Sequence, residues 1–171
     1  KNLVKIVSKG WLDGFYYKPR VDYSVIEEYH EGLICMSACL AGEIPQAIIT
    51  DEDAHARALV EKYHALFGED FYLEVQNHGL EEERKVAYGI KLLSEKSGIP
   101  MVATNDVHYI EKKDSYFQDI LLCIQTQKNV DDKDRMKFEG NEFYLKSYEE
   151  MSELFHYIPE AVANTEKIAD M

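Results

Sequence analysis

A carboxylate and an imidazole, both able to bind metals, stand two residues apart in the stretch Ile99–Tyr109. The stretch follows the turn signal Gly98-Ile99-Pro100 and continues with residues suited to a buried strand, at whose carboxyl end lie Asp106 and His108. Side chains alternate along extended backbone, so these two are expected on the same side, at a strand end where α/β proteins place their chemistry. The spacing therefore indicates two ligands for zinc, manganese or iron. The alternative is a carboxylate that caps a helix beside a solvated histidine.

Two other polar residues follow predicted strands in the same way. Cys39 comes after the apolar run Leu33–Ala38, and His78 comes after Phe71–Gln76. As a thiolate, Cys39 would be a third metal ligand; the alternative is a small buried hydrophobic residue, which is what most free cysteines are. His78 is a candidate ligand, proton donor or phosphate contact, or else an ordinary turn residue before a glycine.

The elements that must position these residues alternate between strands and helices. Strands are predicted at 33–38, 71–76 and 101–104, and the helices that follow them at 52–67 with Asp51 as its cap, at 81–97 and at 115–125. Shorter helices are predicted from Leu3 to Gly10 or Gly14, from Asp22 or Ser24 to His30, around Ala47–Ile49, from the Ser147 capping box to His156, and from Pro159 to Met171.

This order implies right-handed crossovers and parallel strands, so the polar strand ends should converge at one edge. We therefore predict an α/β fold with about three parallel strands flanked by helices. Three strands are few for a closed barrel.

Length and composition fit one domain over residues 1–171, with 46% hydrophobic residues and no apolar run long enough to cross a membrane. The three cysteines include no C-x-x-C pair, and no signal peptide is visible, which favours a reducing cytoplasm. Because the chain does not begin with Met, it is expected to be part of a longer protein.

The charge balance is strongly acidic, at −13 from 32 acidic and 19 basic residues. Such a chain repels phosphate backbones on average and is not expected to bind DNA tightly by itself. The local basic candidates are Lys18 and Arg20, which stand among aromatic residues. The aromatic residues with Lys18 and Arg20 are expected either to stack or hold a phosphate, or else to latch their loop to the domain.

Five sequence blocks, taken together and in order, closely resemble the alpha subunits of bacterial replicative DNA polymerase III, in their polymerase-and-histidinol-phosphatase (PHP) domain. The blocks are Gly14–Asp22, Gly32–Pro45, Val102–Tyr109, Leu121–Thr126 and Glu142–Ser147. The resemblance extends over essentially the whole chain.

The resemblance implies the carboxyl-terminal part of a distorted β/α barrel with a metal cluster at the carboxyl ends of its strands. It also implies that Cys39, Asp106 and His108 are the last three ligands of that cluster and that His78 lies beside it without being a ligand. The cluster would hold zinc or manganese and serve either 3′→5′ exonuclease proofreading or structure, with magnesium serving the polymerase. The family's other ligands and its paired polymerase aspartates are expected outside these residues, so the chain alone should bind metal weakly and be inactive.

The resemblance also bears on partners. In the longer protein these would be DNA and other replicase subunits. For the chain alone we expect self-association through sheet edges exposed by a missing half-barrel. Two other functions stay open: a PHP-type phosphoesterase for a small phosphate ester, and a non-catalytic interaction module.

Overall fold

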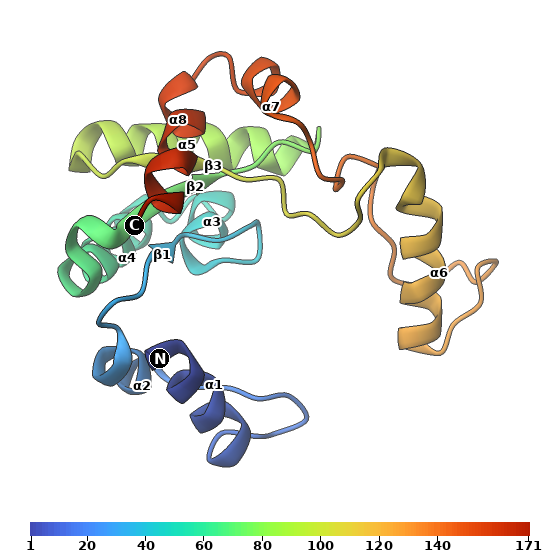
Figure 1. Ribbon diagram of the computed structural model, residues 1–171, viewed down its shortest axis with the longest axis horizontal. Helices are drawn as coiled ribbons and strands as arrows, with labels where there is room; N and C mark the ends of the chain where they lie inside the picture. Colours follow the sequence, from blue (N-terminus) through green and yellow to red (C-terminus); the bar gives the residue numbers. More distant parts are fainter.

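The computed structural model describes all 171 residues, which build three parallel strands and flanking helices (Figure 1). The strands are β1 (Cys35–Met36), β2 (Phe71–Val75) and β3 (Met101–Ala103), in the sheet order β1-β2-β3. In this register, Cys35 lies opposite Phe71 and Leu73 lies opposite Met101. The predicted α/β class with three parallel strands is confirmed, and the open sheet is consistent with a partial barrel.

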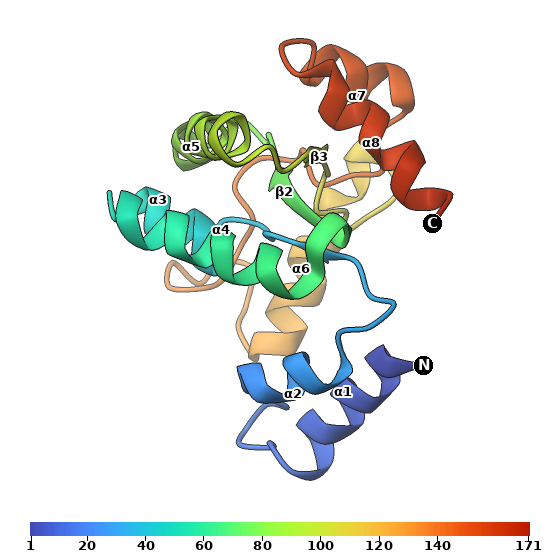
Figure 2. The same cartoon turned by 90° about the vertical axis from the view of Figure 1, so that its left-hand side faces the viewer.

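The sheet is accompanied by eight helices. They are α1 (Asn2–Leu12), α2 (Tyr23–Tyr29), α3 (Glu43–Ile49), α4 (Asp53–Phe67), α5 (Glu81–Ser97), α6 (Ser115–Thr126), α7 (Tyr148–Leu154) and α8 (Pro159–Ala169). Figure 2 shows α3, α4 and α5 on one side of the strands and α7 with α8 on the other. Short 3-10 turns, Gly68–Asp70 and Lys112–Asp114, precede β2 and α6. No helix is both long and apolar enough to span a lipid bilayer.

Local sequence signals explain where several helices begin and end. Helix α5 buries Val86, Ile90 and Leu93, which recur at helical spacing, and ends at Gly98, whose φ of 76° favours glycine. At the start of α7, the Ser147 hydroxyl accepts from the Glu150 amide and the Glu150 carboxylate accepts from the Ser147 amide. The predicted boundaries of α5 and the predicted start of α7 are confirmed.

Two predicted boundaries are wrong. Strand β1 has two residues instead of six. The Ser37 amide still donates to the Tyr72 carbonyl, but the chain turns at the next residue, Ala38, whose φ is +67°. Helix α4 is not capped by Asp51, which has a φ of +60° and whose carboxylate lies 2.7 Å from the Lys85 ammonium. That ion pair joins the α3–α4 turn to α5.

The two outer edges of the sheet differ. At the edge of β3, the buried Asn164 of α8 donates a hydrogen bond of 2.7 Å from its amide to the Met101 carbonyl. Strand β1 pairs only with β2 and is open on its other side. One edge is therefore covered by a helix and the other is free.

Two lobes stand off the sheet, one made of α1 and α2 and the other of α6 with the loop after it (Figure 1). Both expose large apolar side chains. These are Leu3, Val4, Val7, Trp11 and Leu12 on α1, and Tyr116, Phe117, Leu121 and Ile124 on α6. The hydrophobic core lies elsewhere, between the sheet, α3–α5 and α7–α8.

Candidate functional site

The carboxyl ends of the strands are tied together by one carboxylate, that of Glu74 on the central strand. Its Oε1 accepts from the Thr104 hydroxyl at 2.5 Å and from the Gln76 amide at 3.1 Å, and its Oε2 accepts from the Ala38 backbone amide at 3.0 Å. Ala38 follows β1 and Thr104 follows β3. Glu74 therefore sets the positions of the two segments that carry the predicted ligands.

Cys39 is half-buried next to this carboxylate. It borders a small hollow that is lined by the polar side chains of Glu74, Gln76 and Glu83 and by the apolar residues Ala38, Leu40 and Val86. Cys35, four residues earlier, has a different environment, because burial raises the pKa of its thiol to about 11. Cys35 is itself half-buried and packs against the hydrophobic core.

Asp106 and His108 lie on the segment after β3. The backbone at Asp106 has a φ of +42°, and His108 is exposed, with its Nδ1 at 2.6 Å from the Asp106 carbonyl oxygen. A carbonyl can only accept, so Nδ1 carries the hydrogen and Nε2 is left as the metal-capable nitrogen. The His108 ring also contacts the Phe138 ring, with centroids 4.5 Å apart.

These residues do not fit a complete metal site within this chain. No group of three or more His, Cys, Asp or Glu side chains is arranged to hold an ion. The hollow beside Cys39 is not lined by Asp106 or His108. The structure therefore brings the predicted ligands to the same end of the sheet but does not assemble them around one point.

His78 is the most enclosed of the predicted residues. Its ring is stacked on Phe143 with centroids 3.9 Å apart, and its Nε2 donates to the Asn105 carbonyl at 2.9 Å. Its Nδ1 lies 2.5 Å from Glu83 Oε1, so a proton must lie between the imidazole and the carboxylate.

Glu83 is buried in the first turn of α5. Burial opposes its ionisation, but hydrogen bonds from the His78 ring and the His78 backbone amide outweigh it and hold the pKa of Glu83 below its usual 4.5. The Leu80 amide donates to the same carboxylate. His78 and Glu83 thus form a buried pair that joins β2, α5 and the segment after β3.

The segment Glu142–Lys146 runs beside the segment that carries Asp106 and His108. The buried Asn105 amide donates to the carbonyls of Glu142 and Tyr144, at 2.9 and 2.7 Å. Its Oδ1 accepts from the Lys146 ammonium, which is itself nearly enclosed, and burial lowers the pKa of Lys146. Asn105 therefore fixes the backbone next to the candidate ligands.

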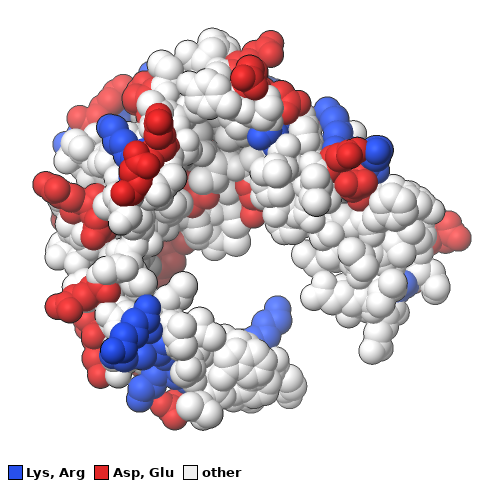
Figure 3. Space-filling view, viewed as in Figure 1, with Lys and Arg blue, Asp and Glu red and all other residues white.

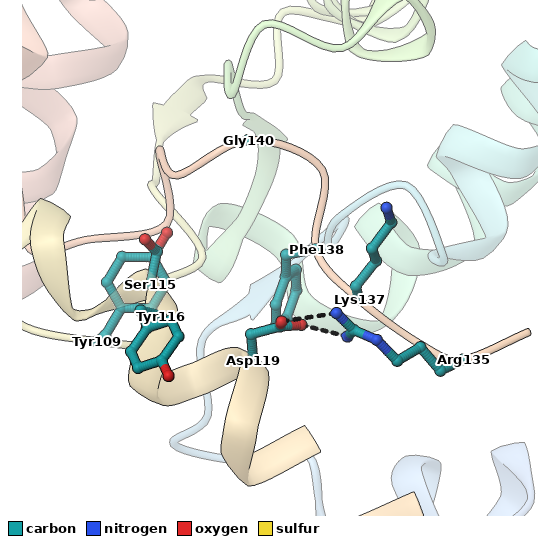
Figure 4. Close-up of a pocket in the computed structure, with 8 residues that line it drawn as sticks. All are labelled: Tyr109, Ser115, Tyr116, Asp119, Arg135, Lys137, Phe138 and Gly140. Atoms are coloured by element: carbon teal, nitrogen blue, oxygen red, sulfur yellow. Dashed lines mark hydrogen bonds and ion pairs between the residues drawn. The ribbon is translucent and has the colours of Figure 1, made fainter. Parts of the chain in front are cut away.

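A cavity of about 410 Å³ lies behind Phe138, between α6 and the loop after it (Figure 4). Figure 4 shows the Arg135 guanidinium facing the Asp119 carboxylate, and the two form paired hydrogen bonds of 2.5 and 2.8 Å. Because this charge is already paired, Arg135 braces the loop instead of offering a free anion site.

The two basic candidates, Lys18 and Arg20, lie in the exposed loop between α1 and α2. This lobe contacts the body through Tyr23, whose hydroxyl donates to the Lys62 carbonyl and whose ring meets that of Tyr63, and through the His30 ring, which meets that of Phe67. Lys18 and Arg20 make no such contact with the body, so the structure does not support the expected alternative in which they latch the loop to the domain.

The sequence pattern does not single out Glu74, Glu83 and Asn105, although their hydrogen bonds hold most of the segments around the candidate ligands in place. Glu74 had a usable signal, since a carboxylate inside an otherwise apolar strand needs a partner when half-buried. Glu83 had none, because it stands in a run of three glutamates at the start of a helix.

The fold and its polar edge define an α/β protein built from parallel β/α units. The sequence profile of the PHP domain matches residues 1–78, a range that includes Cys39 and His78 and ends before Asp106. Proteins named DNA polymerase III subunit alpha are similar over nearly the whole chain. Identity is 51% over 170 residues for that of Treponema pallidum, 45% over 170 for that of Borreliella burgdorferi and 44% over 161 for that of Thermus aquaticus.

These alignments cover 99%, 99% and 94% of this chain but only 14%, 15% and 13% of the three relatives. The chain belongs to the PHP-domain region of the DNA polymerase III alpha-subunit family. It spans about one seventh of the length of the curated relatives it matches.

Proposed function

We propose that the chain contributes part of the PHP domain to a DNA polymerase III alpha subunit and acts with it in DNA-directed DNA synthesis. The observation that supports this most is the 51% identity over 99% of the chain to a protein of that name. In this proposal the partners are DNA and the other subunits of the replicase, and magnesium serves the polymerase, whose catalytic residues lie outside these 171 residues.

We further propose that Cys39, Asp106 and His108 supply part of a zinc or manganese site in the complete PHP domain. The free Nε2 of His108 and the placement of all three residues at one end of the sheet support it. The remaining ligands must come from other segments, since this chain brings no three ligands together. The complete site would serve 3′→5′ proofreading or the structure of the domain.

A chimera tests the assignment directly. In the Treponema pallidum subunit, the matching 170 residues are replaced by this chain, and the product is assayed for extension of primed DNA and for release of a mispaired 3′ nucleotide with and without zinc. Extension at a rate close to the parent's supports the proposal, and loss of extension with intact folding contradicts it.

The same chimera separates the two other functions. Release of phosphate from histidinol phosphate in place of nucleotide release would favour a small-molecule phosphoesterase. Unchanged nucleotide release after substitution of Asp106 and His108 by alanine, with no metal bound, would favour a non-catalytic module.

The isolated chain is expected to bind zinc weakly and to be inactive. Isothermal titration of the 171-residue chain with zinc should give no stoichiometric tight binding, and the Asp106→Asn variant should behave like the parent. Tight one-to-one binding that Asp106→Asn abolishes would show that the three ligands suffice, as they do in three-ligand zinc sites.

A further inference from the structure

The loop that follows α1 is closed on itself by its backbone. The Arg20 amide donates to the Gly14 carbonyl at 3.2 Å, and the Tyr16 amide donates to the Lys18 carbonyl at 3.1 Å. A Cβ on Gly14 would lie 2.0 Å from the Arg20 carbonyl oxygen, so only glycine permits this closure. The loop therefore holds a fixed shape without using its side chains.

Those side chains are aromatic and face solvent. Phe15, Tyr16 and Tyr17 are 54%, 66% and 83% exposed, and Trp11 stacks on Phe15 with centroids 5.4 Å apart and planes 19° apart. Tyr17 has a φ of +57°, which a non-glycine residue rarely adopts. A backbone constrained in this way presents a row of rings to water, where burial of apolar surface gives it no stability.

Positive charge accompanies the rings. The first 20 residues hold five Lys or Arg and one Asp, whereas the whole chain has a net charge of −13. The Arg20 guanidinium lies 5.8 Å from the centre of the Tyr16 ring. Figure 3 shows the blue atoms of this lobe beside an uncharged white end, while the lobe's other acidic residues belong to α2 and its flanks.

We propose that Trp11, Phe15, Tyr16, Tyr17, Lys18 and Arg20 form a platform that binds single-stranded nucleic acid. Unpaired bases would stack on the exposed rings, and the two cations would pair with the phosphates between them. A duplex hides its base faces, and a purely apolar partner would not call for cations among the rings. The inference rests on the proposed function, in which the longer protein handles single-stranded DNA ends.

Trp11 makes the platform directly observable because it is the only tryptophan of the chain. At low salt, an oligothymidylate of about ten nucleotides should quench Trp11 fluorescence in a saturable manner. A duplex of equal length should quench much less. Equal quenching by the duplex or by inorganic polyphosphate would overturn stacking as the mode of binding, and no quenching would overturn the platform.

Charge and stacking are tested by separate variants. The pair Lys18→Ala and Arg20→Ala should lower the slope of log affinity against log salt by about 1.4, at about 0.7 for each phosphate that is no longer neutralised. Tyr17→Leu should weaken binding about tenfold, as expected when one base has no ring to stack on.

Matched controls lie on the exposed side of α5. The pair Arg84→Ala and Lys91→Ala removes the same charge, and Tyr88→Leu removes a ring that is also largely exposed, at 67% against 83% for Tyr17. Circular dichroism checks that every variant is folded. Equal losses of affinity in the control variants would overturn the proposal.

The platform and the proposed function can fail independently. Normal extension of primed DNA by the chimera, together with no quenching of Trp11 in the 171-residue chain, overturns the platform alone. Quenching of Trp11 in the 171-residue chain, together with a chimera that extends no DNA, supports the platform and contradicts the proposed function. A dimer that light scattering detects in the parent chain and that dissociates on Tyr17→Leu would assign the rings to a second copy and overturn the platform.

Discussion

Removal of the Glu83 carboxylate should destabilise the fold more than any other single change at the sheet edge. This carboxylate accepts from the His78 ring at 2.5 Å and from the His78 amide at 2.6 Å, both buried, and from the partly buried Leu80 amide at 3.3 Å. Glu83→Ala would leave three donors without partners and a buried cationic or half-satisfied imidazole. Breaking a buried pair in this way costs about 3–5 kcal/mol in the free energy of unfolding.

Glu83→Gln should cost far less, about 1 kcal/mol. Its amide oxygen can still accept from the two backbone amides, and its NH₂ group can donate to Nδ1 of a neutral His78. The His78 Nε2–H would then keep its hydrogen bond to the Asn105 carbonyl. The difference between the two variants separates the effect of the hydrogen bonds from that of the charge.

Urea denaturation followed by far-ultraviolet circular dichroism measures both effects. Glu82→Ala is the matched control, because it removes the neighbouring, exposed carboxylate from the same first turn of α5 and should cost only about 0.3–1 kcal/mol. The reasoning is refuted if Glu83→Ala costs less than about 1 kcal/mol, or no more than the control.

The same pair should appear in the pH dependence of stability. The folded-state pKa of Glu83 lies below its usual 4.5, so its contribution is complete above that pH and is lost as the pH falls through the folded-state pKa. The double variant His78→Asn with Glu83→Gln removes both titrating side chains of the pair, so the stability difference between the parent and this double variant should shrink as the pH is lowered from about 4.5 toward about 3. A difference that grows on acidification would contradict the assignment.

Three other predictions concern the loops and edges. Gly14→Ala should open the loop after α1, because its Cβ would lie 2.0 Å from the Arg20 carbonyl, and faster hydrogen exchange in that loop would reveal it without change in the sheet. Asn105→Ala should cost about 2–3 kcal/mol and release the segment Glu142–Lys146, seen as faster exchange there, whereas the exposed Asn141→Ala should not. Light scattering at micromolar concentration should find a dimer of the 171-residue chain, paired through its open sheet edge, and a monodisperse monomer would contradict this.

The order of elements could be predicted because local signals agree with the fold. In α5, the apolar spacing and Gly98 indicate the same boundaries, and the alternation of strands with helices is typical of parallel pairing, which the sheet shows. The shortness of β1 could not be predicted, because the apolar run continues through Ala38 while the turn depends on the distant Glu74 carboxylate.

The candidate site was predicted in part for the same reason. Parallel topology places Cys39, His78, Asp106 and His108 at one end of the sheet, and this follows from the sequence pattern. Which of them make contact depends on loops, and no periodicity indicates that His78 would meet Glu83 instead of a metal. The site thus depends on tertiary contacts between segments far apart in the chain.

The unequal edges of the sheet limit how copies of this chain can assemble. The Asn164 amide occupies the Met101 carbonyl on the β3 side, so a strand can be added only beside β1. A sheet with one free edge can join one other such sheet, edge to edge, and the union then offers no further edge. Growth into fibres needs two free edges, so the packing of α8 against β3 would limit assembly by strand pairing to two copies.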